Sequence, residues 1–349
     1  MEKKIKQLVY SFKACFVKHE NILRWLLALL MLSLVGRVVS ANAENLHRLR
    51  DFHPQQLLFV YSLFVVYLFL HACSSYIIVR SVDSVTINLW EWIKIFIVGR
   101  FANTLFAQSG NLYRATVLKK QHHLSFSAYA NVQVFFVWLE TLISLGLAFL
   151  LASFSRSPTM IAGIGIPTIV GLLMSIIFIG PFVAKIILDK WGYTPGVIDK
   201  IHKMLNQMLS FILNRGTDLR LIARITLINL VVFIVWVLLY QTAFEGLGIR
   251  IRLGDLALFL AIYKLSTFLM ITPGNMGVRE AAYALLGQAV GISMAQGIMV
   301  SVVLRIVGYT ILLPTGFVWG GAQLFEAKRR GNQEKESIQS ASNTKNSER

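Results

Sequence analysis

Four charged residues interrupt long apolar stretches of the sequence: Glu140, Lys264, Glu280 and Arg305. Where such a stretch crosses a bilayer, a charged side chain costs about 2.5–3.5 kcal/mol at the centre of the helix, so it usually faces protein or a wet cavity. Arg binds a phosphate through a bidentate fork, and Lys binds it as a point charge. Lys264 and Arg305 are therefore candidates for contact with an anionic headgroup. The alternative is a buried ion pair of each with Glu140 or Glu280.

Glu140 shares a helix face with two polar residues, Gln133 at i−7 and Ser144 at i+4. This pattern is typical of a polar stripe that lines a cavity. It is equally typical of a structural hydrogen bond between membrane helices, because polar residues also hold such helices together.

The segment 272–280 reads TPGNMGVRE and joins two apolar stretches. Glycines and a proline between helical stretches are typical of a discontinuous helix, whose second half begins with unpaired N–H groups that attract anions. A half-helix that begins at Gly277 would carry the positive charge of Arg279, and its dipole would stabilise Glu280 in the first turn. The alternative is a tight cytoplasmic turn with a capping charge pair.

A second polar break runs from Asn103 through Gly110 to Arg114 and ends in a basic cluster. It indicates either a loop that dips into the membrane, with Arg114 near a headgroup, or a solvated basic loop. The neighbouring pair His122-His123 lacks further ligands, so we predict no metal and no cofactor. The sequence contains no phosphate-binding loop, no HExxH and no nucleophile elbow, and we expect no enzyme activity.

The elements that must position these residues are long apolar runs. Of 349 residues 56% are hydrophobic and only 15% are charged, and a membrane span needs about 20 mostly apolar residues. Lipid-exposed runs without alternation must be helices. We predict an all-α polytopic integral membrane protein with about eight transmembrane helices and one or two discontinuous or re-entrant segments. The predicted spans are 22–40, 57–79, 129–153, 160–188, 219–244, 255–271 and 293–323, together with 279–291, which is too short for a clean crossing. Six or seven spans with re-entrant pieces would also fit. We expect an interfacial or partly inserted helix at 85–101, where Glu91 and Lys94 can pair at i,i+3, and a basic linker with an amphipathic helix at 189–218.

The formal net charge of +17 lies mostly in the loops and tails between the apolar runs. This distribution follows the positive-inside rule, so we expect both termini in the cytoplasm and no nucleic-acid partner. We divide the chain into a basic cytoplasmic N-terminus (1–20), a transmembrane domain (21–325) and a disordered cytoplasmic tail (326–349). The GxxxG pairs Gly287/Gly291 and Gly316/Gly320 indicate close helix packing, within the protein or in a homo-oligomer.

Both breaks resemble motifs of a known family, the membrane domain of lysylphosphatidylglycerol synthases and its stand-alone flippase-like relatives. The late motif is a Pro-Gly turn leading to Gly-Val-Arg-Glu, here 273–280, followed by a helix that bears Arg305. The early motif matches at Asn103, Gly110 and Arg114. It departs from the family pattern in two places, because Ala107 stands near the usual proline and Asn111 replaces the usual acidic residue.

The resemblance implies a bacterial cytoplasmic-membrane protein that moves lipids or assists lipid and glycan assembly. We expect it not to make lysylphosphatidylglycerol itself, because no soluble aminoacyl-transfer domain follows residue 325. The leading hypothesis is a lipid translocase for an anionic headgroup or a lipid-linked precursor. The alternative is a non-transporting partner or regulator of an envelope-biosynthesis enzyme, and a third reading is a glycosyltransferase using Glu44 or Asp51. The candidate headgroup-binding residues are Arg279, Glu280, Arg305, Gly277, Asn103, Arg114, Lys264 and Glu140.

Overall fold

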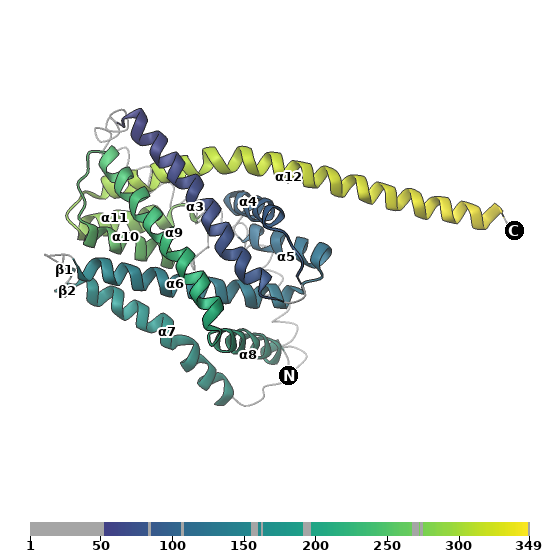
Figure 1. Cartoon of the computed structure of the whole chain (residues 1–349), viewed down its shortest axis with the longest axis horizontal. Helices are drawn as coiled ribbons and strands as arrows, with labels where there is room; N and C mark the ends of the chain where they lie inside the picture. The colour runs from purple at the N-terminus through teal and green to yellow at the C-terminus, as the bar shows by residue number, and fades with distance from the viewer. Residues whose placement is uncertain are drawn as a thin grey trace, which may run out of the picture.

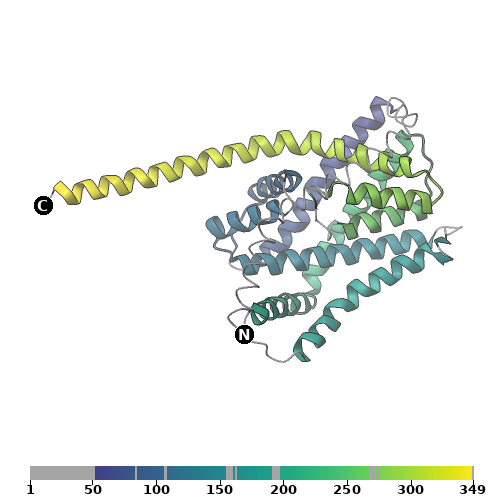
Figure 2. The same cartoon turned by 180° about the vertical axis from the view of Figure 1, so that it is seen from behind.

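The computed structural model describes residues 52–82, 85–105, 108–154, 160–161, 163–190, 197–266, 272 and 275–347. These residues are helical apart from short connections and one hairpin of two-residue strands, β1 (Met160–Ile161) and β2 (Ile164–Gly165). Figures 1 and 2 show the helices gathered into one bundle, from which the last helix projects. The predicted N-terminal segment 1–20 and the predicted first span, 22–40, lie outside the described residues.

Five helices are long and apolar enough to cross a membrane. They confirm the helical membrane character that the sequence predicts, and they correspond to the predicted spans 57–79, 129–153, 160–188, 219–244 and 293–323. The fourth begins later than predicted, because β1 and β2 occupy 160–165. The five are α3 (Pro54–Arg80), α6 (Phe126–Ser153), α7 (Ile166–Lys190), α9 (Leu219–Gly246) and the first part of α12 (Met294–Ser347), residues 294–320.

Four shorter helices form two consecutive pairs, and each pair is joined at one of the two breaks. The first pair is α4 (Leu89–Leu105) and α5 (Ser109–His122); the second is α10 (Leu253–Ser266) and α11 (Val278–Ala289). At 1.5 Å per residue, the 12 residues of α11 span about 18 Å, less than the roughly 30 Å of a hydrocarbon core, as expected for the short segment predicted at 279–291. The predicted span 255–271 includes residues outside the described ones, so its length and the count of about eight spans stay predictions.

The order long helix, two short helices, long helix occurs twice, in α3–α6 and again in α9–α12. The two leading helices, α3 and α9, pack side by side and run antiparallel. Phe52, just before α3, lies against Gly246 at the end of α9. At the other end, Arg215, just before α9, donates to the carbonyl of Ser81, just after α3 (3.1 Å). The two halves of the bundle therefore contain the same order of helices, and the second half is oriented antiparallel to the first.

Helix α4 covers most of the segment 85–101, which is predicted to be interfacial or partly inserted, and the middle of the helix is buried within the bundle. Trp92 is 1% exposed, and its indole N–H donates to Ser75 Oγ of α3 (2.9 Å). On the other side, α12 approaches so closely at Gly316 that a Cβ there would overlap the side chain of Phe101. The GxxxG pair at 316 and 320 therefore serves packing inside the protein. The polar residues that suggested an interface lie near the helix start, where Glu91 pairs with His122 (3.2 Å) rather than with Lys94.

The helices between the two repeats, and the end of α12, complete the fold. Helix α7 exposes a broad apolar face that includes Ile176, Phe182 and Ile186, as expected for a helix that faces lipid. Helix α8 (Val197–Arg215) is the helix predicted within the linker 189–218. Helix α12 continues to Ser347 and so includes the segment 326–347, for which the sequence predicts disorder. That segment is polar, with Ser, Glu, Lys and Asn its commonest residues, and contains no proline to break the helix.

Candidate functional site

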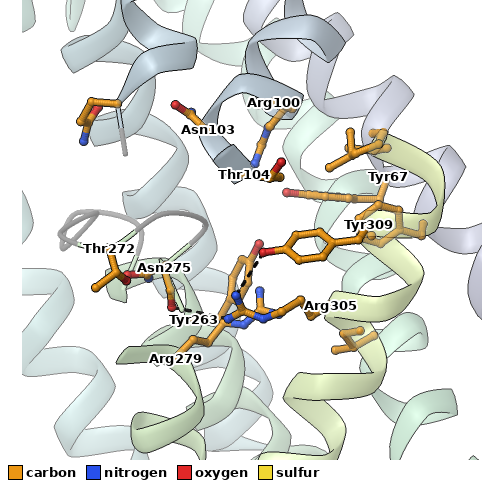
Figure 3. A pocket seen from close by; sticks show the side chains of 16 residues that line it. Tyr67, Arg100, Asn103, Thr104, Tyr263, Thr272, Asn275, Arg279, Arg305 and Tyr309 are labelled. Carbon is orange, nitrogen blue, oxygen red and sulfur yellow. Dashed lines mark hydrogen bonds between the residues drawn. The ribbon is translucent and has the colours of Figure 1, made fainter. Parts of the chain in front are cut away.

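The two helix breaks face a common cavity of about 160 Å³, named here the first cavity (Figure 3). Arg100 and Asn103 reach it from the end of α4, and Asn275 and Arg279 reach it from the second break. Further walls come from α3, α10 and α12. Figure 3 shows the guanidinium groups of Arg279 and Arg305 side by side beneath Arg100, with phenol groups between them. The remaining labelled lining residues are Tyr67, Thr104, Tyr263, Thr272 and Tyr309.

The second break is shaped by residues that tolerate unusual backbone conformations. Gly277 caps α11 with a φ of 79°, a conformation that glycine adopts without strain, and Asn275 has a φ of 57°. The backbone N–H of Gly277 donates to Glu280 Oε2 (2.8 Å), and the hydroxyl of Thr272 donates to the carbonyl of Met276 (2.8 Å). These contacts hold the N-terminus of α11 at the cavity wall, where its dipole favours an anion.

Glu280 connects the two arginines of the second break. Its carboxylate forms an ion pair with Arg305 and accepts a hydrogen bond from Ser301 Oγ at Oε1 (3.0 Å). Ser301 Oγ in turn accepts from Arg279 Nε (3.1 Å), and the Arg279 guanidinium lies 5.3 Å from the centre of the Tyr263 ring. Glu280 is 4% exposed, so its charge is directed to these partners.

The first break closes through glycine and asparagine. The N–H of Gly110 donates to Asn103 Oδ1 (2.7 Å), and a Cβ on Gly110 would overlap the carbonyl oxygen of Gly99. Arg114, one turn into α5, donates to Asn111 Oδ1 (2.7 Å) and to the carbonyl of Gly110 (3.3 Å). Asn111 is thus the acceptor for Arg114 at the position where the family pattern has a carboxylate. Because the amide is neutral, it does not balance the positive charge of Arg114.

A second cavity of about 410 Å³ adjoins the first and is lined by a chain of charged groups. Lys264 of α10 forms an ion pair with Glu140 of α6, and His71 Nε2 lies 3.0 Å from the same carboxylate. His71 Nδ1 faces Arg100 Nη2. Because Arg100 can only donate, Nδ1 must accept, so the geometry is that of a neutral imidazole protonated at Nε2. Arg114 lines the same cavity from α5.

The eight sequence candidates fall into two neighbouring groups. Arg279, Arg305 and Asn103 line the first cavity, while Gly277 and Glu280 build the helix start beside it. Arg114, Lys264 and Glu140 line the second cavity. Of the buried ion pairs left open by the sequence, the structure contains Glu140–Lys264 and Glu280–Arg305.

Sequence reasoning missed three residues. Arg100 and Tyr263 line both cavities, and His71 lines the second cavity. Arg100 lies one turn before the first break, and this position in the sequence could have marked it as a candidate site residue. His71 is a polar residue within the apolar run 57–79 and was overlooked. In the part of the chain that the structure describes, no group of three or more His, Cys, Asp or Glu residues is placed to hold a metal.

Comparison with known proteins gives one match. The family model described as lysylphosphatidylglycerol synthase TM region matches residues 21–316 of the chain. Neither the search of curated proteins nor the search of solved structures found a match.

Proposed function

Because the chain belongs to the family of lysylphosphatidylglycerol synthase transmembrane regions, we propose that it is a lipid translocase that binds an anionic lipid headgroup in the first cavity. The proposal places the protein in a bacterial cytoplasmic membrane, with both termini in the cytoplasm. The short pairs α4–α5 and α10–α11 enter the membrane as re-entrant hairpins from opposite faces.

The observation that carries the proposal is the convergence of Arg100 and Arg279 on one cavity. They come from two different helix breaks, and Arg305 joins them from α12. Among the ion pairs of the described residues, Glu280 is engaged by Arg305, and none involves Arg100 or Arg279. Positive charge without a carboxylate partner inside a bundle is costly unless an anion neutralises it. A phosphate in the first cavity would receive donors from all three arginines.

Movement of the headgroup is supported by the architecture. Inverted repeats with broken helices that meet near the middle of the bundle are typical of transporters, because the two halves can rock around a fixed site. The sequence has no nucleotide-binding motif, so transport would be passive or driven by an ion gradient. Catalysis is not part of the proposal, and no residue is assigned a catalytic role.

The first test is native mass spectrometry of the protein extracted from its own membrane in mild detergent. Wild type would be compared with Arg279→Gln and Arg305→Gln, and with Arg250→Gln as a control that removes an exposed arginine lining neither cavity. We expect wild type and the control to retain a defined anionic lipid that both cavity variants lose. Reconstituted into vesicles, the cavity variants should also fail to translocate that lipid.

The same experiment distinguishes lipid translocation from the alternative role, that of a partner of an envelope-biosynthesis enzyme. A protein that copurifies stoichiometrically, together with no selective lipid, would favour the partner role. A lipid retained equally by wild type and both cavity variants would show that the arginines are structural, and the proposed site would be wrong.

A further inference from the structure

The second cavity resembles the first in its construction. The first cavity lies where both breaks meet α12, and the second lies where the α4–α5 break meets α6 and the end of α10. In each, an arginine from the first turns of the second short helix contributes a guanidinium: Arg279 of α11 and Arg114 of α5. A cavity for an anion therefore has a cationic counterpart.

The two cavities share a wall. Five residues line both of them, and Arg100 is the charged member of this set. A ligand in one cavity would therefore contact the same guanidinium as a ligand in the other. Two anionic groups bound at once would therefore share Arg100, as two phosphates of one headgroup could. The shared residues are Tyr67, Arg100, Asn103, Gln108 and Tyr263.

The charge of the combined site exceeds what a single phosphodiester neutralises. Five cationic side chains line the two cavities, and two carboxylates pair with them, Glu140 with Lys264 and Glu280 with Arg305. His71 adds no charge in the neutral form that its hydrogen bonds require. Three positive charges therefore remain, on Arg100, Arg114 and Arg279, with no carboxylate partner among the ion pairs of the described residues.

Arg114 is the strongest single sign of a second anion. It is 5% exposed, and its acceptors are neutral oxygens, those of Asn111, Gly110 and the Tyr129 hydroxyl. A buried guanidinium with neutral acceptors alone lacks the opposite charge that would compensate for its loss of water. The first cavity does not include Arg114, so an anion bound there leaves this charge unbalanced.

We propose that the second cavity binds a second phosphate of the same headgroup, so that the protein selects lipids with a diphosphate headgroup. This inference rests on the proposed function and narrows its substrate class. A phosphodiester carries about one negative charge, whereas a terminal diphosphate carries about two to three at neutral pH. The larger charge matches the three positive charges of the two cavities.

The test uses three probes that differ by one feature each: geranylgeranyl diphosphate, geranylgeranyl monophosphate and inorganic diphosphate. Binding to the purified full-length chain in detergent would be measured by titration calorimetry. We expect the prenyl diphosphate to bind about tenfold more tightly than the monophosphate, because it gains charge-assisted hydrogen bonds to Arg114. Inorganic diphosphate should bind more weakly than the prenylated compound. Equal affinity for the free anion would show that the ligand is not a lipid and would overturn the proposal.

Variants of the second cavity should remove the preference alone. Arg114→Gln should weaken diphosphate binding about tenfold and leave monophosphate binding at the wild-type level, which also shows that the variant is folded. Gln133→Glu provides a second route, because Gln133 lines only the second cavity and a carboxylate there would repel the second phosphate. Arg250→Gln is the control and should bind both lipids normally.

Failure of this inference differs from failure of the proposed function. If wild type binds both prenyl phosphates equally, and Arg279→Gln abolishes both, the diphosphate preference is wrong while the headgroup site stands. If wild type binds neither compound more tightly than uncharged geranylgeraniol, the proposed function and this inference are both wrong.

Discussion

Glu280 and Arg305, on neighbouring helices, form an ion pair in which the carboxylate also caps α11. One oxygen of Glu280 faces Arg305, and the other accepts the backbone N–H of Gly277 (2.8 Å). The same side chain therefore fixes the shape of the second break and holds one of the cavity arginines in place. A single carboxylate thus links the fold of the hairpin to the charge of the site.

Replacing Glu280 should destabilise the protein. In Glu280→Gln the pair loses its negative charge, and Arg305 loses the ion pair that the structure shows; breaking a largely buried pair costs about 3–5 kcal/mol. We expect a clear fall in the midpoint of thermal unfolding in detergent. The control is Glu245→Gln at an exposed acidic residue of α9. If both variants unfold at the wild-type temperature, the ion pair does not contribute as argued.

The α4–α5 hairpin depends on the absence of a side chain at Gly110. In Gly110→Ala the new Cβ would overlap the carbonyl oxygen of Gly99, which is backbone and cannot move aside cheaply. Overpacking of this kind costs about 1–3 kcal/mol or more. We expect lower yield and a lower unfolding temperature, measured by fluorescence-detected gel filtration after heating.

The matched control for this change is Gly146→Ala. Gly146 lies inside α6, and outside that helix the nearest atom to the position that its Cβ would take is Met174 Sδ at 3.7 Å, an ordinary van der Waals contact with a flexible side chain. Alanine should be neutral or slightly stabilising there, since it favours helix over glycine. Equal behaviour of the two variants would contradict the close packing of α4 and α5.

Sequence alone could predict the long helices and the location of both breaks, but not how the breaks are folded. The sequence marks 272–280 as a break, and only the structure shows that α11 begins at Val278, with Gly277 as its cap. Hydropathy reports the solvent around a helix and not where the helix begins. The start of α11 is fixed by local contacts such as the hydrogen bond from the Thr272 hydroxyl to the Met276 carbonyl.

For the charged residues, too, the sequence predicts the positions but not the contacts. Their cost in an apolar environment marks Glu140, Lys264, Glu280 and Arg305 in the sequence, and all four are in buried ion pairs. Which residue pairs with which could not be predicted, because Glu140 and Lys264 are brought together only by the packing of α6 on α10. Arg100 was missed because Glu91 and Lys94 on the same helix suggested a membrane surface.

The pair Lys264–Glu140 should show strong energetic coupling. Both side chains are 6% exposed, so removal of either leaves a buried charge. In a double-mutant cycle of Lys264→Met and Glu140→Gln, we expect each single change to destabilise and the double change to cost less than their sum, with a coupling of about 0.5–3 kcal/mol. The exposed i,i+4 pair Lys203–Asp199 is the reference, where coupling should be about 0.3–0.5 kcal/mol. Additive effects of the two changes would show that Lys264 and Glu140 do not stabilise each other.

The inverted repeat predicts opposite sides of the membrane for the bases of the two hairpins. The connection between α5 and α6 should face the cytoplasm, and the connection between α9 and α10 should face outward, because α3 and α9 run antiparallel. Single cysteines at Gln121 and Arg250, both exposed, report these positions once Cys15 and Cys73 are changed to serine. In whole cells, a membrane-impermeant maleimide should label the cysteine at 250 and spare the one at 121; inverted vesicles should give the reverse. Labelling of both positions from one face would exclude the re-entrant hairpins and, with them, a headgroup site at which two broken helices meet from opposite sides.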